Sequence, residues 1–184
     1  MGYKRLFIWV EGEDDVRFFN KVIKPILDKK YNWVEVIAYA RMAKKEIDGF
    51  LRSIKAMKAE YIYVTDINDA PCITAKKQQI QSQLKNIAKD KIIVVKKEIE
   101  SWYLAGVGDV ESEKLKIRSF RNTDSISKEC FDNLIPKGFD SKIDFMLEIL
   151  KCFSIKIARQ KNKSFRYFTN NYICCCKVNS DRSI

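Results

Sequence analysis

Apolar runs of strand length alternate with segments of helical periodicity along the first hundred residues. Residues 6–10 form a continuous apolar run, which is typical of a strand buried on both faces of a sheet. Val16, Phe19 and Ile23 then recur at spacings of three and four, as one face of a helix does. We therefore predict a strand followed by a helix, which Pro25 should kink or end.

The same alternation continues to about residue 100. Strands are predicted at residues 33–39, at residues 61–65 and from Lys91. The helix between the second and third strands begins near Ala43, and Thr74 is the predicted cap of the next helix. The predicted inward positions of these two helices are Ile47, Phe50, Leu51, Ile54, Ile80, Leu84 and Ile87. Because they lie within strands, the aromatic residues Trp33, Tyr61 and Tyr63 are predicted to belong to the core rather than to a base-stacking surface.

The alternation stops after Glu100. Residues 106–128 are predicted to be a loop-rich connector, and apolar positions predict helices at residues 143–153 and from Phe165. The fold class is therefore α/β: a Rossmann-like, four-stranded, mainly parallel sheet with flanking helices and a C-terminal helical extension. We expect an α/β domain at residues 1–105, with residues 106–184 packed on the same domain.

Composition narrows the functional classes. The chain of 184 residues has 35 basic and 24 acidic residues, and its net charge of +11 favours a polyanionic partner, nucleic acid before an anionic membrane. It has no histidine, so Ser-His-Asp and Cys-His catalysis and most zinc centres are excluded. The six cysteines lack Cys-x-x-Cys spacing. No apolar run approaches the ~20 residues that span a bilayer, and we expect a soluble, cytoplasmic protein.

Acidic residues follow three of the predicted strands. Glu11 comes directly after the first strand, Asp66 after the third, and Glu100 shortly after the fourth. The carboxyl ends of parallel strands share one edge of a sheet, where open α/β folds place their sites. Carboxylate oxygens are preferred ligands of Mg²⁺, so the pattern predicts a Mg²⁺ (or Mn²⁺) site at this edge.

The first acidic cluster has two interpretations. Gly12 permits a tight turn after Glu11, and Asp15 falls in the first helical turn, so Glu11 and Asp15 are predicted to share a metal ion. Alternatively, Glu13, Asp14 and Asp15 only cap the helix and complement its dipole. We favour the capping interpretation for Asp14.

The later acids also have alternatives. Asp66, with Asn68 and Asp69 before Pro71, is good turn chemistry, although its coincidence with Glu11 favours a functional role. Glu100 is preferred to Glu98 because the apolar residues 102–104 should anchor it, and a buried acid needs a partner or a metal. Glu98 is predicted to be solvated or paired with Lys96 or Lys97.

Two motifs carry a family resemblance. With VEGEDD at residues 10–15 and TDIND at residues 65–69, residues 6–104 resemble the TOPRIM domain of topoisomerases, bacterial-type primases and the overcoming-lysogenization-defect (OLD) nucleases. In that family a Glu ends the first strand and an Asp-x-Asp pair ends the third, and together they bind Mg²⁺ and act on phosphodiesters. Glu11 and Asp66 match these positions, and Asp15 matches the extra Asp of the nuclease branch.

The resemblance is greatest to small, stand-alone TOPRIM-like or OLD-type proteins of prokaryotes, several of which are linked to phage defence. Residues 100–102 (ESW) look like the Glu-x-Trp element of these proteins. One position departs from the pattern, because Asn68 stands where the second Asp is expected, with Asp69 one residue beyond. Asn68 offers an oxygen ligand without charge, which should weaken a Mg²⁺ site unless Asp69 or Glu100 takes over.

These observations predict a Mg²⁺-dependent enzyme that acts on nucleic-acid phosphodiesters, DNA more than RNA, most simply a TOPRIM-type nuclease of phage defence or DNA repair. The predicted catalytic residues are Glu11, Asp66 and Glu100. The predicted metal ligands are Glu11, Asp15, Asp66, Asn68, Asp69 and Glu100. The predicted phosphate-binding residues are Arg41, Lys44, Lys76 and Lys77, and each of these cations has a solvated surface position as its alternative.

Two other functions stay open at this point. One is a non-catalytic nucleic-acid-binding or defence-accessory module with a degenerate TOPRIM site. The other is a receiver-like phosphoacceptor, against which the basic charge and the missing fifth strand-helix unit count. A partner protein or a homodimer is compatible with each of them.

Overall fold

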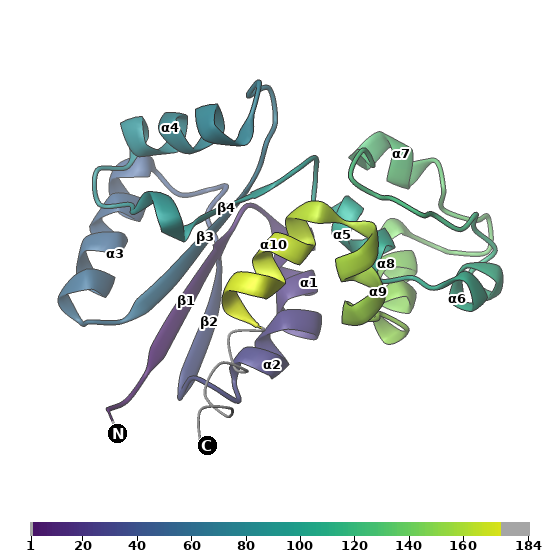
Figure 1. Cartoon of the computed structure of the whole chain (residues 1–184), viewed down its shortest axis with the longest axis horizontal. Coiled ribbons are helices and arrows are strands. Elements are labelled where there is room, and N and C mark those ends of the chain that lie inside the picture. The colour runs from purple at the N-terminus through teal and green to yellow at the C-terminus, as the bar shows by residue number, and fades with distance from the viewer. Residues whose placement is uncertain (1, 174–184) are drawn as a thin grey trace, which may run out of the picture. The chain divides into compact units, whose positions relative to one another are not determined.

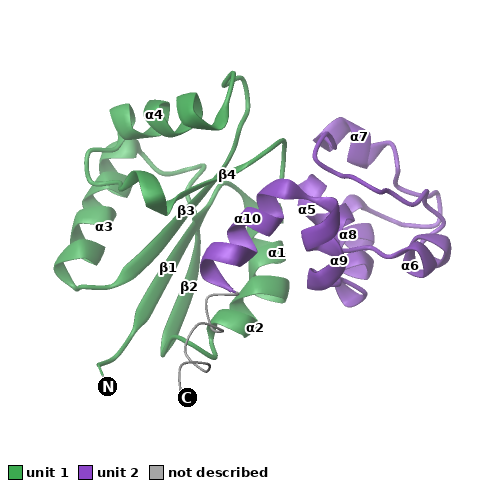
Figure 2. Cartoon of the chain, in the orientation of Figure 1, with its two compact units in different colours: residues 1–99 green, residues 100–184 purple. Residues whose placement is uncertain are grey.

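The chain divides into two compact units, residues 1–99 and 100–184 (Figure 2). The computed structural model describes residues 2–173, so Cys174, Cys175 and Cys176 lie outside the described residues. None of the helices in residues 2–173 combines the length and the apolar character that crossing a bilayer requires. The predicted packing of the C-terminal extension against the sheet domain stays a prediction.

The first unit is built on a four-stranded, all-parallel sheet in the order β2-β1-β3-β4. The strands are β1 (Arg5–Val10), β2 (Trp33–Ala38), β3 (Glu60–Asp66) and β4 (Ile92–Val95). β1 and β4 are almost entirely buried, as their continuous apolar sequences predict. The predicted α/β fold class and four-stranded parallel sheet are confirmed, with α3 (Lys44–Ala56) and α4 (Ile73–Gln83) on one face and α1 (Glu13–Phe18) and α2 (Lys24–Leu27) on the other (Figure 1).

The segment after β1 is helical, but it is not a uniform α-helix. A π-helical turn, η1 (Phe19–Ile23), lies between α1 and α2. Within it, the N–H of Lys24 bonds to the carbonyl of Phe19, five residues earlier. Pro25, which has no N–H, follows directly in the first turn of α2, where a missing donor is tolerated. The proline therefore neither ends nor breaks the helical segment, because the π-turn just before it shifts the helical hydrogen-bond pattern by one residue.

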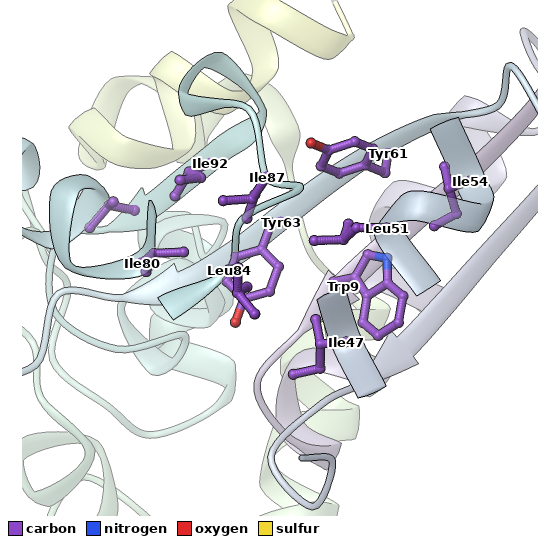
Figure 3. Close-up of a cluster of buried hydrophobic side chains, with 11 residues drawn as sticks. Trp9, Ile47, Leu51, Ile54, Tyr61, Tyr63, Ile80, Leu84, Ile87 and Ile92 are labelled. Carbon is purple, nitrogen blue, oxygen red and sulfur yellow. The ribbon is translucent and has the colours of Figure 1, made fainter. Parts of the chain in front are cut away.

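The sheet face under α3 and α4 carries the apolar cluster drawn in Figure 3. Trp9, Tyr61 and Tyr63 from the sheet are buried against Leu51 of α3 and Ile80 of α4. The other predicted inward positions Ile47, Ile54, Leu84 and Ile87 are also buried. This side of the core therefore follows the predicted periodicity.

Three predictions about this face are wrong. Phe50 is 47% exposed, although its ring meets that of Trp9 in a T-shaped contact with centroids 5.6 Å apart. Trp33 is 52% exposed, because it begins β2, which is an edge strand of the sheet. Thr74 does not cap α4: the cap is Cys72, whose Sγ accepts a hydrogen bond from the N–H of Ala75.

The second unit is helical in the part that the structure describes. It contains α5 (Glu100–Ala105), α6 (Asp109–Lys114), α7 (Lys128–Asp132), α8 (Lys142–Lys151), α9 (Ile155–Lys161) and α10 (Lys163–Tyr172). The predicted helical extension is confirmed, and α8 and α10 match the two predicted helices. The predicted connector nevertheless contains α6, and α7 and α9 were not predicted, because helices of five to seven residues carry little periodic signal. Phe153 lies beyond the end of α8.

A buried aromatic cluster forms the core of this unit. Trp102 of α5 packs against Phe165 and Phe168 of α10, with ring centroids 5.1 and 5.5 Å apart. The indole N–H of Trp102 donates to the hydroxyl of Ser164 at 2.9 Å. The apolar residues after Glu100 therefore anchor the start of α5, as predicted.

Asn162, which is 1% exposed, holds this core together through its side-chain amide. Its Nδ2 donates to the hydroxyls of Ser101 and Thr123 at 3.3 and 3.2 Å, and its Oδ1 accepts from the hydroxyl of Ser164 and the N–H of Phe165 at 2.8 and 2.9 Å. Both halves of the amide are thus satisfied, as a buried polar group requires. The same Oδ1 caps α10.

We expect Asn162→Ala to lower the free energy of unfolding by about 2 kcal/mol, because it removes a helix cap and leaves buried hydroxyls unsatisfied. Urea unfolding followed by circular dichroism measures this change. Asn133→Ala is the control, because Asn133 is exposed and its side chain has no hydrogen bond to another described residue. Equal midpoints for the two variants would contradict a structural role of the Asn162 amide.

Candidate functional site

A cleft of about 390 Å³ opens at the carboxyl ends of β1, β2 and β3. Its polar lining includes residues from five places in the chain: Glu11 after β1, Tyr39 after β2, Thr65 and Asn68 at the end of β3, Lys44 on α3 and Lys76 on α4. A second hollow of about 490 Å³ shares Asn68, Lys76 and Gln79 with the first. The two hollows are therefore adjoining parts of one depression at the sheet edge where the sequence predicts a site.

Backbone pairing beyond the strands fixes Glu11 at this edge. The N–H of Tyr39 donates to the carbonyl of Val10 at 2.9 Å, and the N–H of Ala40 donates to the carbonyl of Glu11 at 3.0 Å. The β1-β2 ladder thus extends to Glu11. The carboxylate of Glu11 has no hydrogen bond or ion pair with another residue in the described part of the chain.

Two tyrosines lie beside Glu11. The rings of Tyr39 and Tyr63 stack with centroids 4.6 Å apart, and the Tyr39 hydroxyl donates to the carbonyl of Val64 at 3.0 Å. Burial raises the pKa of Tyr63 to about 12; a hydrogen bond with Tyr39 partly opposes this rise, and the negative charge of Glu11 adds to it. Burial, followed by the neighbouring Tyr63, raises the pKa of Tyr39 well above its usual value. Both tyrosines therefore stay neutral at physiological pH.

We expect Tyr39 and Tyr63 to titrate above pH 10, the usual pKa of a tyrosine in water. Because folding raises their pKa, their contribution to stability is complete below pH 10 and is lost as the pH rises toward 12. Absorbance at 295 nm during an alkaline titration should show a late phase that Tyr63→Phe reduces. Tyr167→Phe, which replaces an exposed tyrosine outside the cleft, is the control and should leave the late phase unchanged. A late phase unchanged in Tyr63→Phe would contradict this assignment.

Lys76 is the buried cation of the cleft. The residue is only 8% exposed, and its side chain has no hydrogen bond or ion pair with another described residue. Lys44, the first residue of α3, is exposed and lines the same cleft. The structure thus brings two of the four predicted phosphate-binding residues together with Glu11.

The other two predicted cations do not line the cleft. The ammonium of Lys77 donates to the carbonyl of Lys89 at 3.3 Å, and burial, followed by the charge of Lys89, lowers its pKa. Arg41 is exposed in the turn before α3. Adjacent helix positions point about 100° apart, so only Lys76 of the 76–77 pair faces the cleft.

The acids after Glu11 start the helix. Asp15 is 6% exposed, and its Oδ2 accepts a hydrogen bond from the N–H of Gly12 at 3.1 Å. Asp14 pairs with Arg17 at 2.6 Å. Asp15 does not line the cleft that contains Glu11, so its carboxylate serves the first turn of α1 in this structure.

Residues at and after the end of β3 line both hollows. Thr65 lines the first, Asp69 lines the second, and Asn68 lines both, whereas Asp66, the last residue of the strand, lines neither. Asn68 has a φ of 47°, in the left-handed region that Asn adopts more readily than most residues. An Asn at this position therefore suits the turn as well as offering an amide oxygen to the cleft.

Glu100 belongs to the second unit and has a protein partner there. It is 4% exposed, and its Oε1 accepts from the ammonium of Lys142 at 2.7 Å. Burial would lower the pKa of Lys142, but the hydrogen bond and charge of Glu100, with a further contribution from Asp132, raise it. The sequence did not single out Lys142, because it is one of 35 basic residues and lies 42 positions from Glu100.

No group of three or more Asp, Glu or Cys side chains among residues 2–173 is arranged to hold a metal ion. The cleft itself offers oxygen donors of three kinds: the Glu11 carboxylate, the Asn68 amide and the Thr65 hydroxyl. Mg²⁺ in phosphate-processing sites is commonly held by one or two carboxylates, while substrate phosphates and water complete its coordination. The cleft residues fit an ion of that kind, which enters with a phosphate, rather than a preformed carboxylate cage.

The comparisons with known proteins yield one similar structure. No protein-family model matches the chain, and neither does any curated protein. The chain is similar to the C-terminal region of the OLD protein of Xanthomonas campestris pv. campestris, with 15% sequence identity and a TM-score of 0.45. The match covers 93% of this chain and 98% of the other. It assigns no role to any residue.

Proposed function

We propose that the chain binds nucleic acid at the carboxyl edge of its sheet and hydrolyses phosphodiester bonds there with Mg²⁺, as a TOPRIM-type nuclease. The observation that carries this proposal is the cleft that combines Glu11 with Lys44 and the buried Lys76. The resemblance of residues 10–15 and 65–69 to TOPRIM motifs supports it independently of the cleft. DNA as the preferred substrate, a cytoplasmic location and a role in phage defence or DNA repair belong to the same proposal.

The charges of the cleft favour a phosphate ligand. Lys76 is largely buried but its ammonium stays open to the hollows, so a bound phosphate oxygen can reach it and form a charge-assisted hydrogen bond. Lys44 supplies a second cation, and the net charge of +11 favours approach of a polyanion. A phosphodiester provides the anion that Lys76 lacks.

Glu11 is the group in the cleft that can accept a proton. Hydrolysis requires a water molecule to lose its proton as it attacks phosphorus, and the chain has no histidine to take it. The Glu11 carboxylate is partly exposed and lines the cleft together with Lys44 and Lys76. In this proposal Glu11 orients the water, and the two lysines hold the phosphate and offset its growing charge.

In this proposal Glu11 would hold Mg²⁺, and Asn68 and Thr65 would add neutral oxygen ligands. Asp66 and Asp69 are the neighbouring carboxylates. The ion would act as a Lewis acid on the phosphate. Asp15 and Glu100 are not assigned to the cleft in this proposal, because each carboxylate has a partner within the protein. Asp15 bonds to the N–H of Gly12, and Glu100 pairs with Lys142 in the second unit.

A second candidate is the non-catalytic nucleic-acid-binding module. Three observations favour it: Asn68 is neutral, the carboxylate of Asp15 is used at the start of α1, and Glu100 is paired with Lys142. A cleft with one carboxylate and two lysines binds phosphate well without cutting it. The two candidates share the binding site and differ in whether a bond breaks.

Cleavage of labelled single- and double-stranded DNA and RNA tests the proposal. Each substrate is incubated with the protein in Mg²⁺, in Mn²⁺ and in excess chelator. We expect cutting that requires the metal ion and is stronger on DNA. Binding to the substrates without cutting in any metal would contradict the nuclease and favour the binding module.

A further inference from the structure

We propose that the cleft seats a single nucleotide unit, with its phosphate at Lys44 and Lys76 and its base against an apolar wall. The ligand of the site is then a single strand or an unpaired strand end, and not the interior of an intact duplex. This inference rests on the binding part of the proposed function and names its substrate class. It does not depend on whether the bond is cut.

The phosphate position follows from the cation that the cleft buries. Lys76 is 8% exposed, lines both hollows and has no partner among the described residues. The stem of Lys76 is packed in the wall between the hollows, so its ammonium is held at the cleft instead of extending freely into water. A phosphate oxygen at this point would pair the charge of Lys76, with Lys44 on the same cleft to share the remaining charge.

The wall of the same cleft is apolar. It is formed by Met42 before α3, Ile47 on α3, Ile80 in the second half of α4 and Leu84 directly after α4. Ile47, Ile80 and Leu84 are buried parts of the core cluster, whereas Met42 is half-buried. Ile47, Ile80 and Leu84 therefore form a firm wall, and Met42 at its rim can adapt to a flat ring.

Phosphate alone does not account for this wall. A site for a small anion needs cations and N–H donors, whereas a base gains from burial of its faces against apolar side chains. Gln79 and Gln83 also line the cleft, and their amides can donate to or accept from the edge of any base. The lining can therefore contact both the phosphate and the base of a nucleotide.

The hollow to which the apolar wall belongs has room for one unpaired unit. About 390 Å³ is within the range of small-molecule sites. A base inside a duplex is stacked and paired, and it reaches such a pocket only after it leaves the stack, which costs a few kcal/mol. A single strand or a frayed end avoids that cost, so it is the preferred ligand.

Binding measured in chelator, where no cutting takes place, tests the proposal. The probe is a short fluorescent oligothymidylate, compared with the same strand built from abasic units and with a covalently closed circular duplex as competitor. We expect the abasic strand to bind roughly tenfold more weakly than oligothymidylate, in line with the loss of base contacts. Circular duplex should compete poorly.

Two variants locate the phosphate and the base. Lys76→Met should weaken binding of oligothymidylate at least about tenfold, whereas Lys45→Met, which removes an exposed charge of α3 outside the cleft, should change it about twofold or less. Met42→Ser should reduce the difference between the normal and the abasic strand. Thermal unfolding of each variant establishes that it is folded.

Three results would overturn the proposal. They are equal competition by circular duplex, equal binding of the abasic strand by the wild type, and unchanged binding by a folded Lys76→Met variant. If the binding results are as expected but no substrate is cut in Mg²⁺, the nucleotide seat stands and only the nuclease fails. If closed duplex is cut while the single strand does not bind, the nuclease stands and the seat fails.

Discussion

Replacing Glu11 by glutamine should reduce metal-dependent cleavage at least about hundredfold, the loss expected when a general base is removed. Glutamine keeps the size of the side chain and an oxygen donor, but it cannot accept the proton of the attacking water and brings no charge to Mg²⁺. The backbone bond from Ala40 to Glu11 is unaffected. Initial rates on the best substrate, at equal protein and Mg²⁺ concentrations, measure the effect.

The control for this prediction is Glu13→Gln. Glu13 is an exposed carboxylate two residues away and does not line the cleft, so its loss should change the rate by less than about twofold. Asp66→Asn is informative beside it, because Asp66 matches the TOPRIM pattern yet lies outside the cleft lining. A Glu11→Gln variant that cuts as fast as the wild type would rule out both the general-base role and the metal-ligand role of Glu11.

The same variant has a readout that does not depend on catalysis. The charge of Glu11 contributes to the raised pKa of both Tyr39 and Tyr63. In Glu11→Gln the late phase of the tyrosine titration should therefore move to lower pH, although burial keeps it above the ordinary value. A loss of activity together with this shift would place the effect in an intact cleft rather than in a misfolded protein.

The fold of the first unit could be predicted from the sequence because each strand carries its own signal. Runs such as residues 6–10 and 92–95 are apolar throughout, and helical spacing separates them, which leaves a parallel sheet as the consistent arrangement. Trp33 and Phe50 were assigned to the core because a sequence does not reveal which strand is an edge or how far a helix covers it. The exposure of Trp33 follows from the strand order, which local patterns do not determine.

The site was predictable to the extent that it lies at strand ends. Glu11, Lys44, Lys76 and Asn68 line one cleft, as their positions after β1, β2 and β3 suggest. The sequence could not separate Lys76 from Lys77, because their difference depends on the rotation of α4 over the sheet. Nor could it show that Tyr63, predicted to be core because it lies within a strand, and Tyr39 both lie beside the carboxylate of Glu11.

Glu100 illustrates a different limit of sequence analysis. The sequence indicated that a buried acid at this position needs a partner, and the partner is Lys142, the first residue of α8. Lys142 also bonds to Asp132 at 3.1 Å and lies 5.5 Å from the ring centroid of Phe131. This ion pair links α5, α7 and α8 and is a stabilising element of the second unit whatever its role in chemistry.

Lys142→Met should lower the free energy of unfolding by about 3 kcal/mol, because it leaves the carboxylate of Glu100 buried without a counter-charge. The side chain of Glu100 is only 5% exposed, whereas that of Lys142 is 21% exposed. The expected loss in free energy of unfolding is therefore at the lower end of the range for breaking a buried ion pair. Urea unfolding at neutral pH measures the loss. Lys151→Met is the control, because its pair with Glu148 is exposed and should contribute little.

The double variant separates the pair from simple damage to the core. If an unpaired charge is the cause, Glu100→Gln combined with Lys142→Met should recover part of the stability that Lys142→Met loses. The pH dependence has a defined sign: folding raises the pKa of Lys142, so the pair contributes fully below pH 10.5 and its contribution is lost as the pH rises further. The wild type and Lys142→Met should therefore differ most at neutral pH and converge in strong alkali. A difference that stays constant across this range, with no recovery in the double variant, would assign the effect to packing of the Lys142 stem instead of to its charge.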